Sequence, residues 1–522
     1  MKNWIHLVIF VTLMATLALA QPKQEKRDLL QDIEIAEAAI LNAKDQPEKL
    51  KPLFAEYYRF LFELDSRVYD QNSIKKNATR IAVKLQTLRK ILNKELKKWP
   101  KEITDDLKFR ESLQAITRAS HYAEDMVAEI SLGLEKSKKG DRSWPSFQGG
   151  MPFSFTADNR PLLYKDFKSG DILLMRGGSS VSAAIARVTD FNSVFSHAAV
   201  VYVDESTGKK YVVEALIEIG ITINPLEQAL DHGVARMLAL RHKDEVMAKV
   251  GAEALYQLAQ ISLQTKKPIF YDFTMSGKIP DLSFEQMMSY YKGNRDPKVV
   301  NEMQSFKAFC SLLIDMADRF AHEKLGLPQR LEDPTLRSSL DPKNRNFLRR
   351  LGISDAQKSV YAPGDGQMDS RYDIIGDSRN PFRTAGLRAD DYILDKIFEW
   401  MDRDALEFKE VKILEAVGKF ANSTSRIGFM RKLYHSQGLA VAPHVPPKVI
   451  STVIMLDYMR NQIHKQIQPL LLAFETQFGV PMPPKQIFIE IEKVYESHPE
   501  VLKYLIKPSA AQMQCRKSAS KN

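Results

Sequence analysis

The sequence predicts an α+β fold, in which a central group of strands lies between two helical regions. The composition, 44% hydrophobic and 27% charged, is ordinary for a globular protein. The length of 522 residues allows two to four compact units. Apolar residues at steps of three and four indicate helices in residues 24–137 and again from about residue 345. Short apolar runs bounded by turn residues indicate strands between these two regions.

These patterns divide the chain into five segments. We expect a signal peptide at 1–20, a helical bundle at 21–140, a linker at 141–162, a mixed α/β domain at 163–345 and a mostly helical region at 346–522. The linker carries glycines, prolines and aromatic residues without helical period, as domain boundaries often do.

The first residues have the order of a secretory signal peptide. Lys2 gives a positive start, residues 7–19 are almost wholly apolar, and Ala18-Leu19-Ala20 supplies small residues for cleavage. The alternative is an uncleaved membrane anchor, but the apolar run is short against the roughly 20 residues of a bilayer span. We therefore expect export, to a periplasm or outside the cell, after cleavage near Ala20.

Four helices are predicted in the first region, at 27–44, 50–70, 74–99 and 104–135. In the third, apolar residues form one stripe from Ile74 to Trp99. Between Lys75 and Lys98 there are also nine Lys or Arg and one Glu. This basic helix is either a solvated outer face or a contact with anionic wall polymer or a membrane surface, and the net charge of +10 suits anionic surroundings. We expect no nucleic-acid partner.

The central domain begins with a predicted strand at 171–175 and a helix that Ser180 would cap and that runs to about Thr189. Residues 196–203 and 211–217 are strand-like around a turn at 204–208, which predicts a β-hairpin. Helices are expected at 244–264 and 310–325, and the Gly/Asp-rich stretch 363–380 is expected to be a loop.

The sequence contains two cysteines, Cys310 and Cys515, which are candidate reactive groups. Cys310 opens a helical run, where unpaired N–H groups and the helix dipole favour a thiolate and could hold an oxyanion. A lone cysteine is otherwise most often a small buried hydrophobic residue. Cys515 lies in a polar tail, so we expect two free thiols, although one bridge between them is the alternative.

His197 opens the first strand of the predicted hairpin, and Glu214 lies on the returning strand. If Ala199 pairs with Glu214, the carboxylate is diagonal to His197 on the same face of the sheet. Glu214 could then bind one imidazole nitrogen and leave the other to take a thiol proton. A slip of one residue would move Glu214 to the opposite face, and His197 would be a structural residue.

We expect no metal and no cofactor. Paired zinc-ligand patterns are absent from the sequence. Four aspartates (Asp365, Asp369, Asp373 and Asp377) recur every four residues, whereas a calcium loop needs alternate positions. These aspartates are expected in a solvated loop.

Five motifs occur in an order that resembles a known family. They are GDILLMR (170–176), FSHAAVV (195–201), VVEAL (212–216), PIFYDF (268–273) and AFCSLLIDMA (308–317). Together they resemble the YiiX/YebB-like branch of the permuted papain-like cysteine hydrolases in the NlpC-like superfamily. In that branch the cysteine follows the histidine along the chain, as it does here.

The resemblance implies a permuted papain-like core over roughly residues 160–340 and a role for each matching residue. Cys310 would be the nucleophile, His197 the base and Glu214 the residue that orients it. Tyr271, Asp171 and Ser196 would lie on the substrate side of the site. Two departures from the family stand out. Leu312 replaces a common Glu or Gln, and some 38 residues separate Asp272 from Cys310, an insertion that could cover the cleft as a lid.

The implied chemistry is acyl transfer by an exported cysteine hydrolase, with an amidase or peptidase acting on cell-wall peptides as the expected activity. The alternatives are a hydrolase or acyltransferase for lipid amides or esters, a silent module that binds wall or lipid, and a structural protein dominated by its helical ends.

Overall fold

The computed structural model describes most of the chain between residues 26 and 507. It covers residues 26–96, 98–99, 104, 106–132, 153–156, 158, 160–187, 189, 193–231, 234–328, 345–353, 360–411 and 445–507. The expected signal peptide, most of the expected linker and Cys515 lie outside these residues. The described residues form a mixed helix and sheet structure, in agreement with the predicted α+β class.

Four helices form the N-terminal region, near the positions that the apolar stripes predict, except that the second ends at Phe62 and not near residue 70. They are α2 (Leu29–Asn42), α3 (Pro47–Phe62), α4 (Gln71–Leu96) and α6 (Leu107–Leu132). The side chain of Asp28 caps α2 by accepting from the N–H groups of Leu30 and Gln31, and Pro47 opens α3. The four helices share one apolar core.

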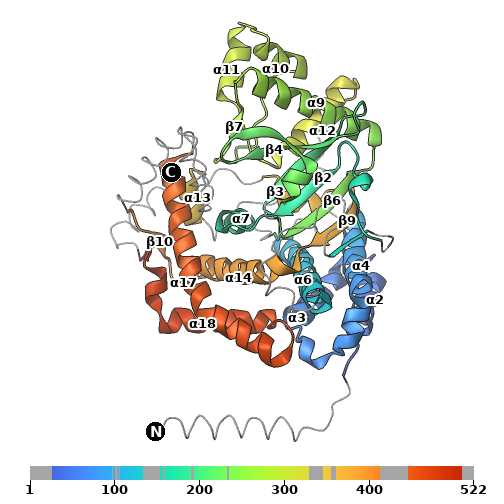
Figure 1. The fold of residues 1–522 in the computed structure, drawn as a ribbon, viewed down its shortest axis with the longest axis vertical. Coiled ribbons are helices and arrows are strands. Elements are labelled where there is room, and N and C mark those ends of the chain that lie inside the picture. The colour runs from blue at the N-terminus through green and yellow to red at the C-terminus, as the bar shows by residue number, and fades with distance from the viewer. Residues whose placement is uncertain are drawn as a thin grey trace, which may run out of the picture.

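A seven-stranded antiparallel sheet forms the centre of the molecule (Figure 1). Its order is β1 (Phe153–Thr156), β9 (Tyr372–Arg379), β6 (Arg236–His242), β2 (Ile172–Arg176), β3 (His197–Val203), β4 (Lys210–Leu216) and β5 (Gly220–Pro225). The predicted β3–β4 hairpin is confirmed, with Ala199 opposite Glu214. Strands β1 and β9 come from outside the predicted range 163–345, so the sheet extends beyond the expected domain on both sides.

The prediction of a solvated loop at 363–380 is wrong. This stretch forms a 3-10 helix, η6 (Pro363–Met368), followed by strand β9, which pairs with β6 and β1. Asp365, Asp369 and Asp377 are buried, and only Asp373 is exposed. The strand looks polar in the sequence because its buried charges are neutralised by partners from other parts of the chain.

Helices cover both faces of the sheet, and the strand residues alternate between them. Ile172 and Leu174 face the helices α9 (Glu245–Gln264) and α12 (Leu312–Lys324), both within the predicted ranges. Leu173 faces the short helix α8 (Leu226–Asp231) on the other side. The helix after β2 is α7 (Ser180–Ile185), and it is Ser179 rather than Ser180 that caps it.

The two helices of the insertion before Cys310, which could have formed a lid, pack away from the thiol. Its helices α10 (Phe284–Tyr291) and α11 (Pro297–Ser305) lie with α9 at the top of Figure 1. The ring of Phe284 packs on Phe320, and its N–H donates to Glu323, near the C-terminal end of α12. Cys310 lies at the opposite end of that helix. The insertion returns through β8 (Lys307–Ala308), which pairs with β7 (Phe270–Tyr271).

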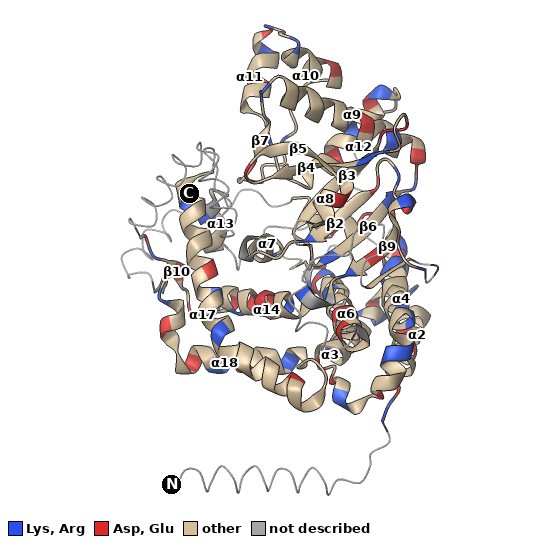
Figure 2. Cartoon of the chain, in the orientation of Figure 1, with Lys and Arg blue, Asp and Glu red and all other residues tan. Residues whose placement is uncertain are grey.

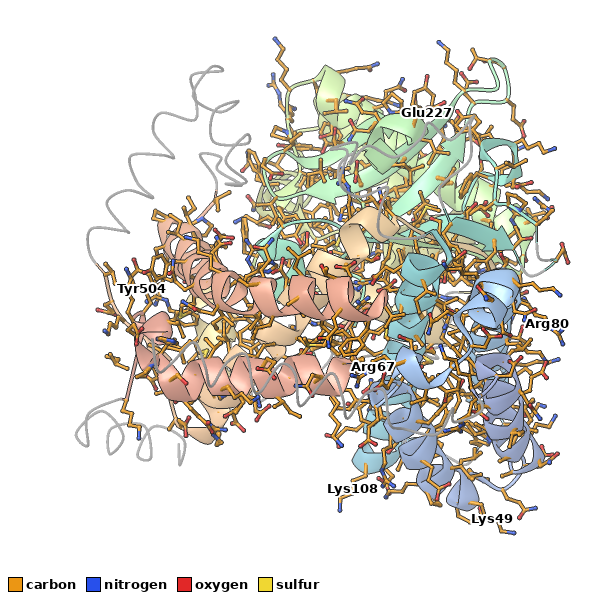
Figure 3. All side chains as sticks on the ribbon, turned by 60° about the horizontal axis from the view of Figure 1, so that its bottom comes forward. Lys49, Arg67, Arg80, Lys108, Glu227 and Tyr504 are labelled. Atoms are coloured by element: carbon orange, nitrogen blue, oxygen red, sulfur yellow. The ribbon has the colours of Figure 1, made fainter. Side chains whose placement is uncertain are left out.

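The C-terminal region is helical, as predicted, and contacts the N-terminal helices. Its elements are α13 (Arg345–Leu351), α14 (Pro381–Arg403), α17 (Pro447–Phe478), α18 (Pro484–Ser497) and the pair β10 (Glu407–Phe408) and β11 (Leu505–Ile506). The remaining short elements are the 3-10 helices η1 (Ser66–Val68), η4 (Tyr164–Asp166) and η7 (Pro499–Leu502). Arg67 lies over the rings of Phe474 and Phe478 at 4.8 and 4.7 Å, where α17 meets the N-terminal helices (Figure 3). Among the described residues, no helix is both long and apolar enough to cross a membrane.

Buried ion pairs join the N-terminal helix α6 to the sheet and to α14. Asp125 of α6 pairs with Arg236 of β6 at 2.6 Å, and Glu129 pairs with Arg388 of α14 at 2.7 Å. Asp391 of α14 in turn binds Arg236 at 3.2 Å. The N-terminal helices therefore pack as part of the same folded body as the sheet.

Candidate active site

Cys310 lies between β8 and α12, at the end of the sheet where β3 begins. Its side chain is buried, and α12 starts two residues later at Leu312. Backbone N–H groups of Ala198 and Ser311 hydrogen-bond to the sulfur. The hydroxyl of Ser311 donates to the carbonyl of Tyr361 at 2.6 Å, which anchors the turn that carries the thiol.

The structure brings His197 and Glu214 together with Cys310. His197 hydrogen-bonds to the thiol, and its Nε2 lies 2.6 Å from Oε2 of Glu214. Because Nε2 faces the carboxylate, Nδ1 is left for the sulfur. The side chain of His197 is 21% exposed, so solvent can reach the imidazole ring.

The local electrostatics favour a thiolate–imidazolium pair. Burial raises the pKa of the Cys310 thiol, but the hydrogen bond and charge of His197 and the two backbone N–H groups outweigh it, so the net pKa is lowered. Burial lowers the pKa of His197, yet Cys310 and Glu214 raise it overall to about 10. A lowered thiol pKa beside a raised imidazole pKa is the pattern of an activated cysteine.

Tyr271, at the end of β7, also contacts the thiol. Its hydroxyl hydrogen-bonds to Cys310, and its ring lies 5.2 Å from that of Phe273. Burial and the neighbouring Cys310 raise the pKa of Tyr271 well above its ordinary value. The hydroxyl therefore stays protonated and can donate a hydrogen bond to an oxygen near the sulfur.

Asn224 is a site residue that sequence reasoning missed. Its Nδ2 donates to Oε1 of Glu214 at 2.7 Å, so the carboxylate is held between Asn224 and His197. Strand β5 follows β4 in a second hairpin, with Thr222 opposite Glu214. Recognising that hairpin in the sequence would have placed Asn224 diagonal to Glu214, but its residues GITINP were not identified as a strand.

Of the other two residues expected on the substrate side, Asp171 lies elsewhere and Ser196 lies beside His197. Asp171 is buried at the opposite end of β2, where Arg241 donates to both of its carboxylate oxygens at 2.8 and 2.7 Å. Ser196 is buried beside His197, and its N–H donates to the carbonyl of Met175 at 2.9 Å. Neither side chain is shown in contact with the Cys310 thiol.

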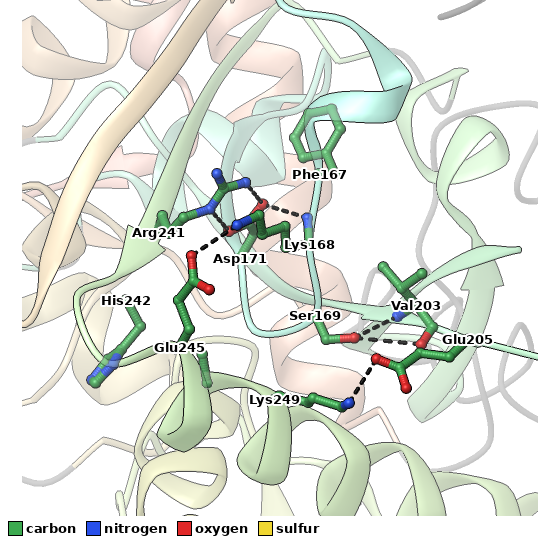
Figure 4. Close-up of a pocket in the computed structure, with 11 residues that line it drawn as sticks. Phe167, Lys168, Ser169, Asp171, Val203, Glu205, Arg241, His242, Glu245 and Lys249 are labelled. Carbon is green, nitrogen blue, oxygen red and sulfur yellow. Dashed lines mark hydrogen bonds and ion pairs between the residues drawn. The ribbon is translucent and has the colours of Figure 1, made fainter. Parts of the chain in front are cut away.

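Asp171 belongs to a separate hollow of about 270 Å³ (Figure 4). Exposed Lys–Glu pairs, Lys168 with Glu245 and Lys249 with Glu205, stand on its walls. The hollow reaches Val203, at the far end of β3 from His197, which is roughly 20 Å for a strand of this length. It is therefore distinct from the site around Cys310.

One buried group in the described part of the chain has the composition of a metal site. His121, Glu124 and Asp377 offer ligand atoms within 4.8 Å of one another. However, Arg379 binds both carboxylates, and Arg89 binds Glu124 at 2.7 Å. These guanidinium groups already supply the positive charge, so the donor set does not fit a cation.

A family model matches the middle of the chain. Residues 166–281 match the family described as "Permuted papain-like amidase enzyme, YaeF/YiiX, C92 family". The matched segment includes His197, Glu214, Asn224 and Tyr271 and ends before Cys310. No curated protein matches the chain. On this match, residues 166–281 resemble the permuted papain-like amidases of the YaeF/YiiX family.

Proposed function

We propose that the protein is an exported cysteine hydrolase that acts by acyl transfer through Cys310, His197 and Glu214. The observation that carries the proposal is the position of His197, which is hydrogen-bonded to the thiol on one side and to the carboxylate on the other. This is the arrangement of nucleophile, base and orienting group that covalent catalysis requires. The proposed chemistry needs no metal or cofactor.

In the proposed reaction, the Cys310 thiolate attacks the carbonyl carbon and a C–S bond forms. His197 donates its Nδ1 proton to the leaving nitrogen as the C–N bond breaks, which leaves a thioester. Water then gives a proton back to His197 while its oxygen attacks the thioester carbon. The acid leaves, and the thiolate–imidazolium pair is restored.

Tyr271 is the proposed donor to the oxyanion of the tetrahedral intermediate. Its hydroxyl contacts the sulfur and stays protonated because its pKa is raised by burial and by Cys310. A protonated donor beside the nucleophile can stabilise the charge that develops on the carbonyl oxygen. The expected role of Tyr271 on the substrate side is thus compatible with its position.

The first candidate substrate is an amide bond in a cell-wall peptide, which fits a family of amidases and the expected export. A lipid amide or ester is the second candidate, and a specific observation favours it. Phe270, next to Tyr271, and Ile219, on the turn before β5, are large apolar side chains exposed at 38% and 45%. Both could contact a hydrocarbon chain near the site.

The test is a mass-spectrometric screen of the purified protein against peptidoglycan fragments and acyl-lipids, repeated on variants. Cys310→Ala should abolish turnover, His197→Ala should cost about 10³-fold or more, and the double variant should cost little more, because the residues act as one unit. Turnover that survives in Cys310→Ala would exclude the mechanism. Binding by the wild type without turnover of any compound would favour the silent binding module instead.

The basic helix α4 is proposed as a contact with anionic wall polymer. Figure 2 colours the Lys and Arg residues of the chain blue, and Figure 3 labels Arg80 of α4. Arg80 and Lys84 share Glu34, but the described residues show no ion pair for four lysines of this helix, Lys75, Lys76, Lys90 and Lys94. In α4 no large hydrophobic residue is exposed, which favours a polymer held by charge over insertion into a membrane.

The polymer contact can be tested by co-sedimentation with purified cell wall at low and raised salt. Replacing Lys76, Lys90 and Lys94 with Gln should weaken binding, whereas replacing three exposed lysines elsewhere (Lys209, Lys292 and Lys307) should not. Equal loss in both triple variants would mean that only the net charge matters. Binding of both variants to anionic vesicles but not to wall would point to a membrane.

A further inference from the structure

Three neighbouring strands present polar side chains to one another in a diagonal line across one face of the sheet. Ala199 of β3 lies opposite Glu214 of β4, and Thr222 of β5 lies opposite Glu214 on the other side. His197 and Asn224 are each two residues from these partners, so both are diagonal neighbours of Glu214. The line runs from Cys310 at one end to Asn224 at the other.

From this geometry we infer that Asn224 is a positioning residue of the site, which fixes the Glu214 carboxylate that orients His197. The two oxygens of Glu214 have different partners: Oε2 faces His197 at 2.6 Å, and Oε1 accepts from Asn224 at 2.7 Å. With one oxygen held, the carboxylate cannot rotate away from the imidazole without losing the other bond. The inference rests on the proposed function of this site.

The amide of Asn224 suits this task better than a charged or apolar side chain would. Its Nδ2 must point to Glu214, because the amide oxygen in that place would repel the carboxylate. A neutral donor holds the carboxylate without cancelling its negative charge. The charge of Glu214 therefore stays available to the imidazolium, whereas a lysine at position 224 would compete for it.

Asn224 is half-buried and follows the strand alternation, so its position is fixed by the backbone of β5. Thr222, on the same face, lies directly across from Glu214, yet the structure shows no side-chain hydrogen bond between them among the described residues. Thr222 therefore offers a matched control, close to the same carboxylate but without the proposed role.

The experiment compares wild type, Asn224→Leu and Thr222→Val in the full-length protein. The pKa of His197 is measured by NMR with ¹³C-labelled histidine, and the His197→Ala variant assigns its signal. We expect Asn224→Leu to lower this pKa by about one unit or more, since a hydrogen bond to a charged group is lost. Thr222→Val should leave it unchanged.

The rate of Cys310 alkylation by iodoacetamide at pH 7 gives a second readout. It should fall several-fold in Asn224→Leu and stay constant in Thr222→Val. If Asn224→Leu does not fold, Asn224→Ala removes the same donor without added bulk. An unchanged His197 pKa and alkylation rate in a folded Asn224 variant would overturn the inference.

Failure of the proposed function would look different. In that case His197→Ala itself would leave the alkylation rate of Cys310 unchanged. If His197→Ala slows alkylation and the Asn224 variant does not, only the role of Asn224 is refuted.

Discussion

The side chains of Cys310 and Tyr271 are buried next to each other, and burial and hydrogen bonding have opposite effects on the pKa of the thiol. Burial raises the thiol pKa, but the imidazolium of His197 and the N–H groups of Ala198 and Ser311 lower it overall. Burial and the neighbouring Cys310 both raise the pKa of Tyr271, which lies well above its ordinary value. The same environment thus lowers the pKa of the thiol and raises the pKa of the hydroxyl, which suits an attack followed by oxyanion stabilisation.

Replacing Tyr271 with Phe should therefore separate two reactions of the same thiol. Hydrolysis of the best substrate should slow by about 10²–10³-fold, since one oxyanion donor is removed. Alkylation of Cys310 by iodoacetamide should change little, because that reaction builds no oxyanion. Equal losses in both reactions would mean that Tyr271 acts on the thiol and not on the intermediate.

The residues of the site were predictable where strand alternation applied to them. His197 and Glu214 follow from the β3–β4 hairpin, whose register is confirmed. Asn224 required the next hairpin, which the sequence does not mark clearly. Asp171 was expected at the site because it belongs to a motif, but its carboxylate is bound by Arg241 at the other end of β2. A motif identifies residues that recur together without stating which of them share a site.

Helices α2 and α3 show how an apolar stripe can include a buried acid. Glu37 of α2 lies in the shared core, and the hydroxyl of Tyr57 in α3 donates to it at 3.4 Å. Burial raises the pKa of Glu37 to about 8, although Lys84 and the Tyr57 bond lower it. The folded protein thus prefers this side chain protonated.

The raised pKa of Glu37 predicts a pH-dependent loss of stability. The unfolded chain releases the Glu37 proton near the ordinary carboxyl pKa of 4.5, and the folded chain only near a pKa of about 8. Between these values the folded state binds more protons, so stability should fall as pH rises from about 4.5 to 8. In Glu37→Gln, the free energy of unfolding should change less over this pH range, by an amount on the order of a few kcal/mol. The measurement is urea unfolding at several pH values across the range. Glu56→Gln, on an exposed position of α3, is the control. An unchanged slope in Glu37→Gln would show that Glu37 ionises normally in the fold.

Strand β9 shows why some elements were not predictable. Its Asp377 and Arg379 are fully buried, and a buried charged pair looks like a solvated loop in the sequence. Both are neutralised by Glu124 and Arg89 of helices far away in the chain, as well as by each other. Helices with an amphipathic period, such as α4 and α12, needed no such partner and were predicted correctly.

Across the whole molecule, Asp391 of α14 connects the sheet to the helical flanks. It pairs with Arg176 of β2 at 2.7 Å, Arg187 after α7 at 3.1 Å and Arg236 of β6 at 3.2 Å. Burial raises the pKa of Asp391, but the three arginines hold it well below its usual range. All four side chains are fully buried, so the charges depend on one another.

Asp391→Asn should destabilise the whole molecule, because it leaves three buried guanidinium groups with too little negative charge. A loss of about 3–5 kcal/mol in the free energy of unfolding is expected. Asp402→Asn, on an exposed position of the same helix, should change it by less than about 0.5 kcal/mol. The measurement is urea unfolding followed by circular dichroism. Equal stability of the two variants would show that the network does not hold the regions together.

The activation of Cys310 by His197 is the central claim, and it can be measured without knowing the substrate. The measurement is the rate of iodoacetamide labelling of Cys310 at pH 6, read by peptide mass spectrometry, in wild type and in His197→Ala. Because the same buried cysteine is compared in both proteins, differences in access largely cancel. We predict that the His197→Ala rate is at least about tenfold lower, since an unassisted thiol is almost wholly protonated at this pH. Equal rates in the two proteins would contradict the account.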